Sequence, residues 1–350
     1  MRLAVAALVL ALATSASAQP ATGSGTGHPG KLVYKDTAMG TNVSVWFWTD
    51  READAARTAQ AMFEEIKRLD REMTTWRPDS EISQINTASG EHPVKVSDET
   101  LEVIERAVDV SRRSGGVFDI TVQAFHGLWK FDEDMDGSLP DPADVKKRLL
   151  LVGWRDIVVD RAAKTVFLRR KGMAITLGGI AKGYAVDKCV ALIKKAGFTD
   201  FMVQAGGDMY VSGSKGAESW MVGIRDPRTP DSNPDLFALA PITNHSFSTS
   251  GDYERGFVKD GVRYHHILDP RTGQPAHASR SVTIRAKDAF TADAWSKVMF
   301  IDGPTLGQKI IKDNHLDDFE AVWVDDKNNV IMTPAIKKVM IIKHPPTDGI

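Results

Sequence analysis

Apolar residues along this chain follow two different spacings, and each spacing predicts a different element. β-Branched and aromatic residues fill positions 31–35 and 42–48, with Met39-Gly40-Thr41 between them, which predicts two strands joined by a hairpin-like turn. Residues 53–73 carry apolar side chains at helical spacing, which predicts a long helix. A second helix is predicted over 97–113, with Ser97 as its N-cap and Gly115-Gly116 at its end.

Shorter elements follow in the rest of the chain. Strands are predicted at 157–160, 165–169, 202–204, 209–212, 220–224, 265–268, 282–285, 321–323 and 330–332. Helices are predicted at 181–196, 291–300 and 306–313. Runs of strands separated by irregularly placed helices indicate an α+β fold with mixed or antiparallel sheets and packed helices, not a doubly wound parallel sheet.

The N-terminus has the pattern of a targeting segment. A positive start, an apolar run from Leu3 to Ala13 and an A-x-A-like site predict a signal peptide over 1–18, with a buried helix as the alternative. Residues 19–30 are rich in Gly, Thr, Ser and Pro and predict a disordered leader. No Cys follows the apolar run, and no later stretch is long enough to span a bilayer. We expect a soluble, periplasmic or otherwise exported protein without a lipid anchor, with one domain over 31–345.

Composition narrows the classes of function. The 350 residues are 42% hydrophobic and 26% charged, which is ordinary for a folded globular protein. Lys and Arg number 44 against 46 Asp and Glu, so the net charge of -2 argues against a dedicated nucleic-acid binder. A single cysteine, Cys189, rules out an internal disulfide framework and a Cys-based metal cage. Cys189 lies on an apolar helical stripe, so we expect it in the core.

Two glycine-rich segments are candidates for a phosphate site. The segment from Thr176 to Tyr184 places glycines between a short strand and a helix, and Lys182 adds a positive charge. Tight packing of the strand against the helix would explain the same glycines equally well. Gly206-Gly207-Asp208, between two predicted strands, is either a hairpin turn or a second ligand contact.

Two later segments carry polar groups that suit catalysis. His266 precedes an Asp-Pro-Arg turn at Asp269 and could act as a base, although a structural histidine explains the pattern better. Asp293, Ser296 and Lys297 share one helical face, where an Asp and a hydroxyl could hold Mg²⁺. Taken alone, a surface Asp–Lys pair is the favoured explanation of that face.

The order of these segments is more specific than any one of them. Along the chain they are Met39-Gly40-Thr41, Ser80 to Ser83 with Asn86, Gly116 to Val122, Leu177 to Gly183, Gly206 to Asp208, Thr249 to Tyr253, His266 to Gly273 and Ala292 to Ala294. In this order they resemble the ApbE family of FAD:protein FMN transferases. The similarity extends from about Lys31 to beyond Gly303.

This resemblance implies a fold, an activity and a set of site residues. It implies a T-fold-related single domain that binds FAD with Mg²⁺ and transfers FMN to a Thr or Ser hydroxyl of a target flavoprotein, releasing AMP. The positions that resemble FAD contacts are Met39, Trp76, Val117, Phe118, Asp119, Thr176, Lys182 and Ile267. The positions that resemble the metal site are Gly179, through its carbonyl, Asp293, Ser296 and Lys297. The resemblance and the residue types make His266 the candidate acceptor of the hydroxyl proton, with Asp293 as the second catalytic residue.

Two positions depart from the pattern that the family usually shows. Thr176 stands where the family has Asp, and Lys297 stands where it has a Thr that contributes a ligand. Two unit charges about 4 Å apart interact by ~4 kcal/mol at an effective dielectric constant of 20. An ammonium beside Asp293 would therefore weaken Mg²⁺ binding by about three decades. Two readings stay open: an active transferase that retains Mg²⁺ or uses Lys297 as its cation, and an exported FAD-binding protein with weak or no transferase activity.

Overall fold

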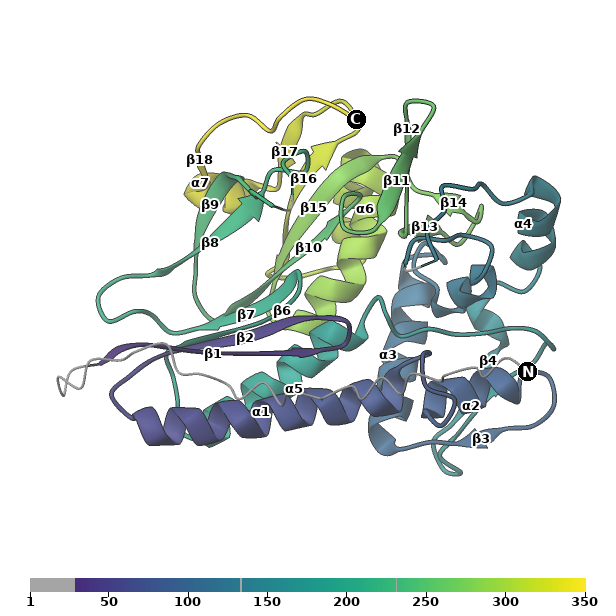
Figure 1. The fold of residues 1–350 in the computed structure, drawn as a ribbon, viewed down its shortest axis with the longest axis horizontal. Helices are drawn as coiled ribbons and strands as arrows, with labels where there is room; N and C mark the ends of the chain where they lie inside the picture. Colours follow the sequence, from purple (N-terminus) through teal and green to yellow (C-terminus); the bar gives the residue numbers. More distant parts are fainter. Residues whose placement is uncertain (1–28, 133, 231) are drawn as a thin grey trace, which may run out of the picture.

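The computed structural model describes residues 29–132, 134–230 and 232–350 (Figure 1). The predicted signal peptide (1–18) lies outside the described residues, and so does the predicted leader (19–30) except for its last two residues. Strand β1 begins at Gly30, one residue before the predicted strand over 31–35.

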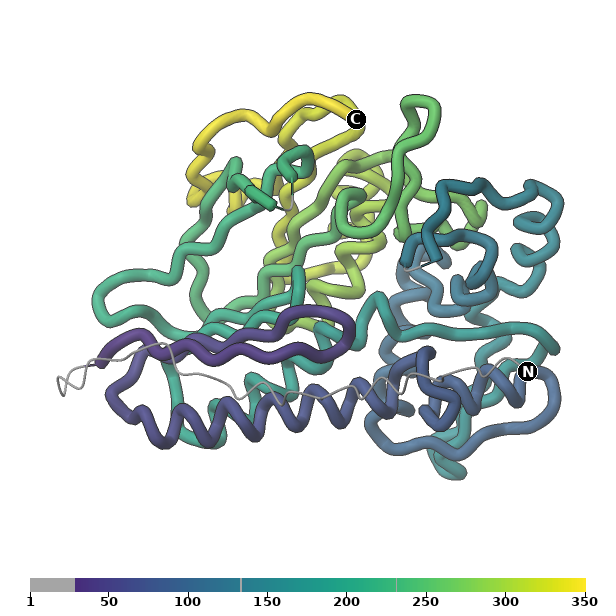
Figure 2. Tube along the Cα trace, viewed as in Figure 1, coloured from purple at the N-terminus to yellow at the C-terminus, as the bar shows by residue number. Residues whose placement is uncertain are grey.

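The centre of the fold is an eight-stranded antiparallel sheet with the strand order β1-β2-β6-β7-β10-β15-β16-β17. Figures 1 and 2 show the β1–β2 hairpin lying beside β6, although about 150 residues separate them in the sequence. The strands are β1 (Gly30–Ala38), β2 (Thr41–Thr49), β6 (Phe201–Ala205), β7 (Asp208–Ser212), β10 (His245–Gly251), β15 (Ser279–Ala286), β16 (Glu320–Asp325) and β17 (Val330–Met332).

Three helices pack on one face of this sheet and bury the main core. They are α1 (Glu52–Met73), α5 (Ala181–Lys195) and α6 (Ala289–Asp313). The helical spacing predicted over 53–73 is confirmed, because its apolar side chains from Ala55 to Met73 are buried. Cys189 of α5 is buried in this core, as expected. The two helices predicted at 291–300 and 306–313 form one helix with a kink, where Gly303 has a φ of 69° and Pro304 follows.

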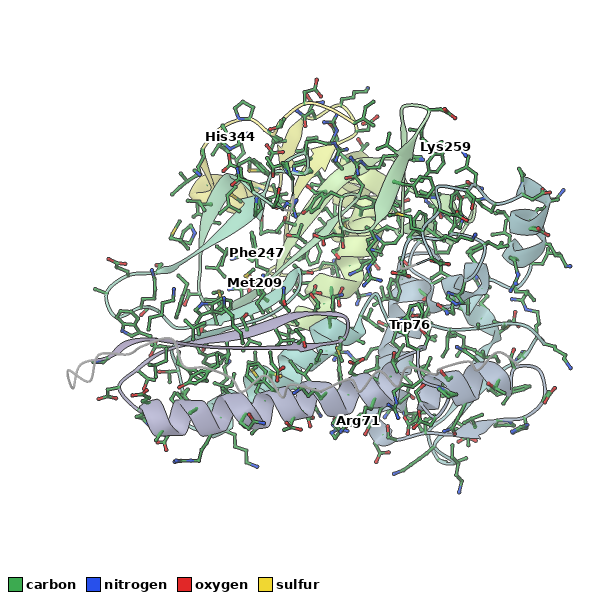
Figure 3. The ribbon with its side chains drawn as sticks, viewed as in Figure 1. Arg71, Trp76, Met209, Phe247, Lys259 and His344 are labelled. Carbon is green, nitrogen blue, oxygen red and sulfur yellow. The ribbon has the colours of Figure 1, made fainter. Side chains whose placement is uncertain are left out.

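The opposite face of the sheet carries a second, smaller layer. It contains β8 (Trp220–Arg225), β9 (Leu236–Ile242), β18 (Ile341–Ile342) and α7 (Pro334–Val339). Phe247 of β10, labelled in Figure 3, points into the core between these layers. Its neighbours Ser246 and Ser248 point the other way, toward the helices, because side chains alternate along a strand.

The remaining elements form a lobe beside the end of the central sheet (Figure 1). They are α2 (Glu81–Thr87), β3 (Val94–Lys95), α3 (Asp98–Arg113), η1 (Ile120–Phe125), α4 (Pro142–Leu149), η2 (Trp154–Asp156), β4 (Ile157–Asp160), β5 (Thr165–Leu168), β11 (Gly256–Lys259), β12 (Val262–His265), β13 (Leu268–Asp269) and β14 (Gln274–Pro275). Ser97 caps α3 as predicted, accepting a hydrogen bond from the Thr100 amide. The strand predicted at 265–268 is wrong, because the chain leaves β12 after His265 and enters β13 at Leu268.

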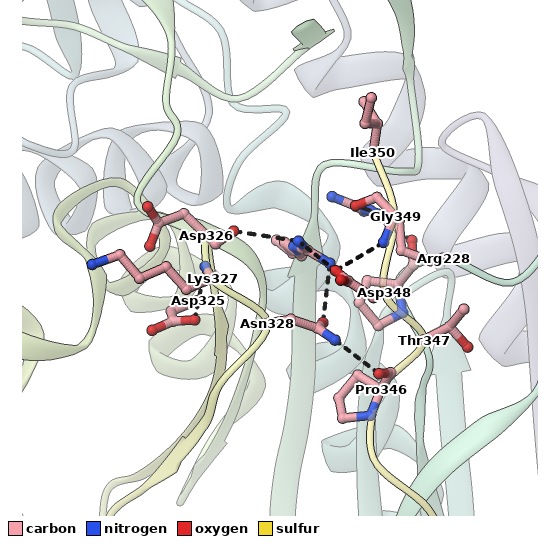
Figure 4. A network of polar contacts seen from close by, with 12 residues as sticks. Arg228, Asp325, Asp326, Lys327, Asn328, Pro346, Thr347, Asp348, Gly349 and Ile350 are labelled. Atoms are coloured by element: carbon pink, nitrogen blue, oxygen red, sulfur yellow. Dashed lines mark hydrogen bonds and ion pairs between the residues drawn. The ribbon is translucent and has the colours of Figure 1, made fainter. Parts of the chain in front are cut away.

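A polar network fixes the last residues of the chain against the sheet (Figure 4). The Asn328 amide donates to the carbonyl of Pro346 (2.8 Å), and the Thr347 amide donates to Asp226 Oδ2 (2.8 Å). Arg228, in the same turn as Asp226, makes a buried two-pronged ion pair with Asp252, at 2.7 and 2.8 Å. This pair anchors the segment that follows β10, one side of the site described below.

The antiparallel pairing of every strand in the central sheet confirms the predicted α+β class. Over the described ranges, every helix is too short or too polar to cross a lipid bilayer.

Candidate functional site

The site begins at an unusually close contact between helices α5 and α6. A Cβ on Gly183 would lie 2.4 Å from the Ala289 carbonyl oxygen and 2.7 Å from Cβ of Asp293, so only glycine allows this approach. The Gly183 amide uses the proximity to donate to Asp293 Oδ2 (2.9 Å). One turn further along α5, Asp187 accepts from the first two amides of α6, at 2.8 and 2.9 Å. The glycine-rich segment therefore serves tight packing at Gly183.

Four charged side chains meet where these helices approach the sheet. Lys182, at the start of α5, lies 3.1 Å from Asp208 Oδ2, at the start of β7. Lys297 of α6 forms an ion pair with Oδ1 of Asp293 and also donates to the Asp293 carbonyl (3.0 Å). Both carboxylates are buried, whereas the lysines retain 24% and 19% of their side-chain exposure. The sequence favoured a surface Asp–Lys pair at 293 and 297, and the full burial of Asp293 shows that this was wrong.

Serines on β10 complete the floor of this cluster. Ser248 hydrogen-bonds to Asp208 Oδ1, and Ser250 lies 2.7 Å from the hydroxyl of Ser296 on α6. The Ser296 hydroxyl also donates to the Asp293 carbonyl (2.7 Å). Positions 248 and 250 share one face of the strand, and their small side chains leave room for α6.

The electrostatics of the cluster separate its two carboxyl groups. Burial raises the pKa of Asp208, but the positive charges of Lys182 and Lys297 outweigh it and leave this pKa below its usual range. Burial and the negative charge of Asp208 raise the pKa of Asp293. Both Asp293 oxygens nevertheless accept a hydrogen bond, which is the state of a carboxylate. Burial lowers the pKa of Lys182, but the negative charges of Asp208 and Asp293 raise it by more. The pKa therefore lies above its usual value, and Lys182 stays charged.

Two glycine turns close on the same cluster. Gly206, with a φ of 60°, turns the chain between β6 and β7, and its amide donates to the Asn42 carbonyl (3.0 Å) beyond the β1–β2 turn. The hairpin predicted at Gly206-Gly207-Asp208 is thus confirmed. The Gly207 carbonyl accepts a hydrogen bond from the amide of Thr249 (3.0 Å), which lies between Ser248 and Ser250. On the other side, Gly179 is close enough to Phe118 and Lys297 that an added Cβ would lie 3.5 and 3.7 Å from them.

The segment from Val117 to Asp119 borders the glycine turn of α5 and is buried. The Thr176 amide donates to the Ile120 carbonyl (2.9 Å), which ties the two segments together, and the Thr176 hydroxyl accepts from the Gly178 amide (3.1 Å). The Asp119 carboxylate accepts from Thr121 and from the Trp154 amide, so it caps η1. Burial raises the pKa of Asp119, although these hydrogen bonds oppose the rise.

Two of the predicted FAD contacts lie on turns outside the group of four charged side chains. Trp76, between α1 and α2, is 70% exposed and stands edge-on to the His126 ring, with centroids 5.9 Å apart (Figure 3). Such exposure is rare for a tryptophan and leaves one ring face available for stacking. Met39 has a φ of 51° in the β1–β2 turn, and its amide donates to Asp70 (2.8 Å).

The His266 side chain is exposed, next to the buried Ile267. Its amide donates to the Arg255 carbonyl (3.1 Å). The pKa of His266 is lowered, first by partial loss of hydration among the surrounding segments and then by the positive charges of His265, Arg255 and Lys297. His266 is therefore a neutral imidazole at neutral pH and lies within electrostatic reach of Lys297.

The structure thus gathers Gly179, Lys182, Asp293, Ser296 and Lys297 into one cluster, with Phe118 and Thr176 at its border and His266 near it. Trp76 and Met39 lie on separate loops. Asp208, Ser248 and Ser250 belong to the cluster but were absent from the predicted site residues. The Gly-Gly-Asp motif and the alternating small residues of β10 were the signals that could have identified them.

A sequence model of the ApbE family matches residues 39–323, more than half of the chain. The chain belongs to the ApbE family. Its relatives include FAD:protein FMN transferases of Klebsiella pneumoniae, 31% identical over 86% of this chain and 91% of the relative, and of Treponema pallidum, 34% identical over 77% and 78%.

Solved ApbE structures have the same fold. The ApbE protein of Thermotoga maritima superposes with a TM-score of 0.80 at 31% identity, covering 89% of this chain and 99% of the other. The flavin transferase ApbE of Vibrio cholerae superposes with a TM-score of 0.78 at 24% identity over the same shares, and this second likeness supports the fold alone.

The ApbE resemblance implies Mg²⁺, and the residues present do not suit it. Both carboxylate oxygens of Asp293 and its carbonyl already accept hydrogen bonds, two of them from Lys297. Thr176 contributes no negative charge. Within the part of the chain that the structure describes, no three His, Cys, Asp or Glu side chains gather closely enough to hold a metal ion. The donor set that a hard dication prefers is therefore incomplete.

Proposed function

We propose that this protein is an FAD:protein FMN transferase, which moves FMN from FAD to a Thr or Ser hydroxyl of a target flavoprotein and releases AMP. Curated relatives that cover most of this chain carry that name. The observation that carries the proposal is the placement of Lys182 at the start of α5, beside two glycine turns that lie far apart in the sequence.

FAD is proposed to lie across this cluster with its diphosphate near Lys182. The Lys182 ammonium, in the first turn of α5, favours an anion there, while the Gly183 amide of the same turn already donates to Asp293 Oδ2. Trp76 offers an exposed ring face to the isoalloxazine. Met39, Val117, Phe118 and Ile267 are proposed to border the flavin or adenine as apolar walls. Asp119 and Thr176 are proposed to act indirectly, through the hydrogen bonds by which they hold the neighbouring backbone turns in place.

The reaction replaces one P–O bond with another. The acceptor hydroxyl oxygen bonds to the phosphorus on the FMN side, and the bond from that phosphorus to the AMP oxygen breaks. His266 is our candidate for accepting the hydroxyl proton, because it is an exposed imidazole within electrostatic reach of Lys297, and a neutral imidazole has a free nitrogen lone pair. AMP leaves with the electron pair of the broken bond. Asp293 contributes by holding the Lys297 ammonium beside the diphosphate.

We also propose that the protein is exported and that the protein accepting FMN is exported with it. The pattern of residues 1–18 supports export, and the acceptor would be an exported flavoprotein that presents a Thr or Ser hydroxyl.

The test is incubation of the protein with FAD and an acceptor flavoprotein. Mass spectrometry of the acceptor should show the addition of one FMN with loss of water, and AMP should appear in equal amount. An acceptor Thr→Val variant is the control, since it removes the hydroxyl and keeps the shape. FAD hydrolysis to FMN and AMP with no adduct on the acceptor would contradict the proposal.

A second candidate function is FAD binding with weak or no transfer. The contact between Lys297 and Asp293 favours it, because this ion pair stands where the ApbE resemblance implies a metal. Tight FAD binding without an adduct under any metal condition would support this alternative.

A further inference from the structure

Lys297 is held as a fixed cation at the centre of the site. Its ammonium contacts both Oδ1 and the main-chain carbonyl of Asp293. Its aliphatic chain passes close to Gly179, whose missing Cβ would lie 3.7 Å from Lys297 Cε. The positive charge therefore stands between the α6 carboxylate and the turn that precedes Lys182.

The neighbouring oxygens already have partners in this arrangement. Asp293 Oδ2 accepts from the Gly183 amide, and the Ser296 hydroxyl is shared between Ser250 and the Asp293 carbonyl. A divalent cation at this position would have to displace the ammonium, which stays tethered one helical turn away. It would then find one buried carboxylate and mainly neutral oxygens.

The charges of the cluster are balanced without a metal. Lys182 and Lys297 contribute two positive charges, and Asp208 and Asp293 contribute two negative charges. Before FAD binds, a dication added to this largely buried group would leave a net charge of +2, and Thr176 supplies no carboxylate to reduce it. Thr176 and Lys297, the two departures from the family pattern, thus both disfavour the binding of a divalent cation.

From these observations we infer that the Lys297 ammonium takes the place of a divalent cation, contacts the FAD diphosphate and allows FMN transfer without Mg²⁺. This inference rests on the proposed function. The ammonium offers three N–H donors, of which two are used by Asp293, so one remains for a phosphate oxygen. It neutralises negative charge that builds up on the diphosphate as the bond to AMP breaks. No further reactant is needed, because the acceptor hydroxyl supplies the new P–O bond and His266 takes its proton.

The first test uses the native protein, so it does not depend on the folding of any variant. FMN transfer is measured in EDTA and in millimolar Mg²⁺, and the binding of Mn²⁺, as a paramagnetic probe, is measured by electron paramagnetic resonance with FAD present. We expect equal transfer rates in the two conditions and no saturable Mn²⁺ binding at the site.

The second test restores the metal ligands. The double variant Thr176→Asp/Lys297→Thr should bind Mn²⁺ at least about a thousandfold more tightly than the native protein, because removal of the Lys297 charge alone accounts for about three decades and the new carboxylate adds to it. Its FMN transfer should stop in EDTA. Lys309→Thr is the matched control, since Lys309 also pairs with an Asp four residues away on α6 but is exposed. This control should behave as the native protein does.

The two hypotheses fail in different ways. Transfer that requires Mg²⁺ in the native protein, or native Mn²⁺ binding as tight as that of the double variant, overturns the role of Lys297 and leaves the proposed function standing. Absence of both FAD binding and transfer in every metal condition overturns the proposed function, and the role of Lys297 falls with it.

Discussion

The contact between α5 and α6 makes Gly183→Ala the sharpest test of how this site is built. The new methyl group would lie 2.4 Å from the Ala289 carbonyl oxygen, 2.7 Å from Asp293 Cβ and 2.8 Å from the Ala289 carbonyl carbon. Two of these three atoms are backbone, so no side chain can rotate away to make room. The two helices must separate.

The expected cost follows from three contributions. Overpacking against rigid neighbours costs about 3 kcal/mol. Separation of the helices also weakens the hydrogen bond from the Gly183 amide to the Asp293 carboxylate, which is worth about 1.5–3 kcal/mol. The higher helix propensity of alanine returns about 1 kcal/mol. The free energy of unfolding should therefore fall by about 3.5–5 kcal/mol, or roughly 7–10 °C in Tm at about 2 °C per kcal/mol.

The measurement is thermal unfolding followed by far-ultraviolet circular dichroism, together with an FAD titration. Gly178→Ala is the matched control in the same turn, because Gly178 is exposed and its added Cβ would lie at an ordinary 3.4 Å from the Thr176 hydroxyl. That control should change the free energy of unfolding by less than about 1 kcal/mol. Equal Tm values for Gly183→Ala and the native protein would refute the close-packing argument.

Three further predictions concern Lys182, Trp76 and His265. Lys182→Met should weaken FAD binding by roughly 10–100-fold in a flavin fluorescence titration, the value of a charged hydrogen bond. Lys182→Arg should keep most of the affinity, and unchanged binding by Lys182→Met would place the diphosphate elsewhere. Trp76→Ala should weaken FAD binding by about threefold to tenfold, the value of one aromatic contact, while the exposed position keeps Tm nearly constant. Wild-type flavin affinity in Trp76→Ala, or a large loss of Tm, would contradict this role. Burial lowers the pKa of His265 to about 4, while its Nε2 bonds to the Ala276 carbonyl (2.6 Å) and its Nδ1 accepts from the Ile267 amide. Because the unfolded chain binds the proton first, stability should be complete above about pH 6.5 and fall by about 3 kcal/mol as the pH drops to 4. Urea unfolding against pH should show this slope, and His265→Gln, which keeps the Nε2–H donor without titrating in this range, should lose it.

The elements that were predicted correctly are those that depend on residues close together in the sequence. The buried stripe of α1, the β1–β2 hairpin and the Ser97 cap of α3 depend on neighbours within a few residues, so spacing and residue type were enough. The strand predicted at 265–268 failed because His265 ends β12, where it pairs with Gly256 of β11, whereas Leu268 begins β13, where it pairs with Pro275.

The site residues also fall into two groups: those that motif order identifies and those whose partners only the tertiary structure shows. Motif order singled out Lys182, Asp293 and His266, and the ApbE resemblance implied roles for them that stay predictions. The pairing of Lys182 with Asp208 and of Ser296 with Ser250 could not be read from the sequence, since each pair joins separate elements.

The sequence by itself determined the class of fold, the family and the unusual residues at 176 and 297, because these depend on residue types and their order. Only the tertiary structure decided that Asp293 is fully buried and that Lys297 is bound to it. The physical reason is that one glycine lets α5 and α6 approach closely enough to exclude water. Without that approach, the same Asp and Lys would form an exposed helical pair of little consequence.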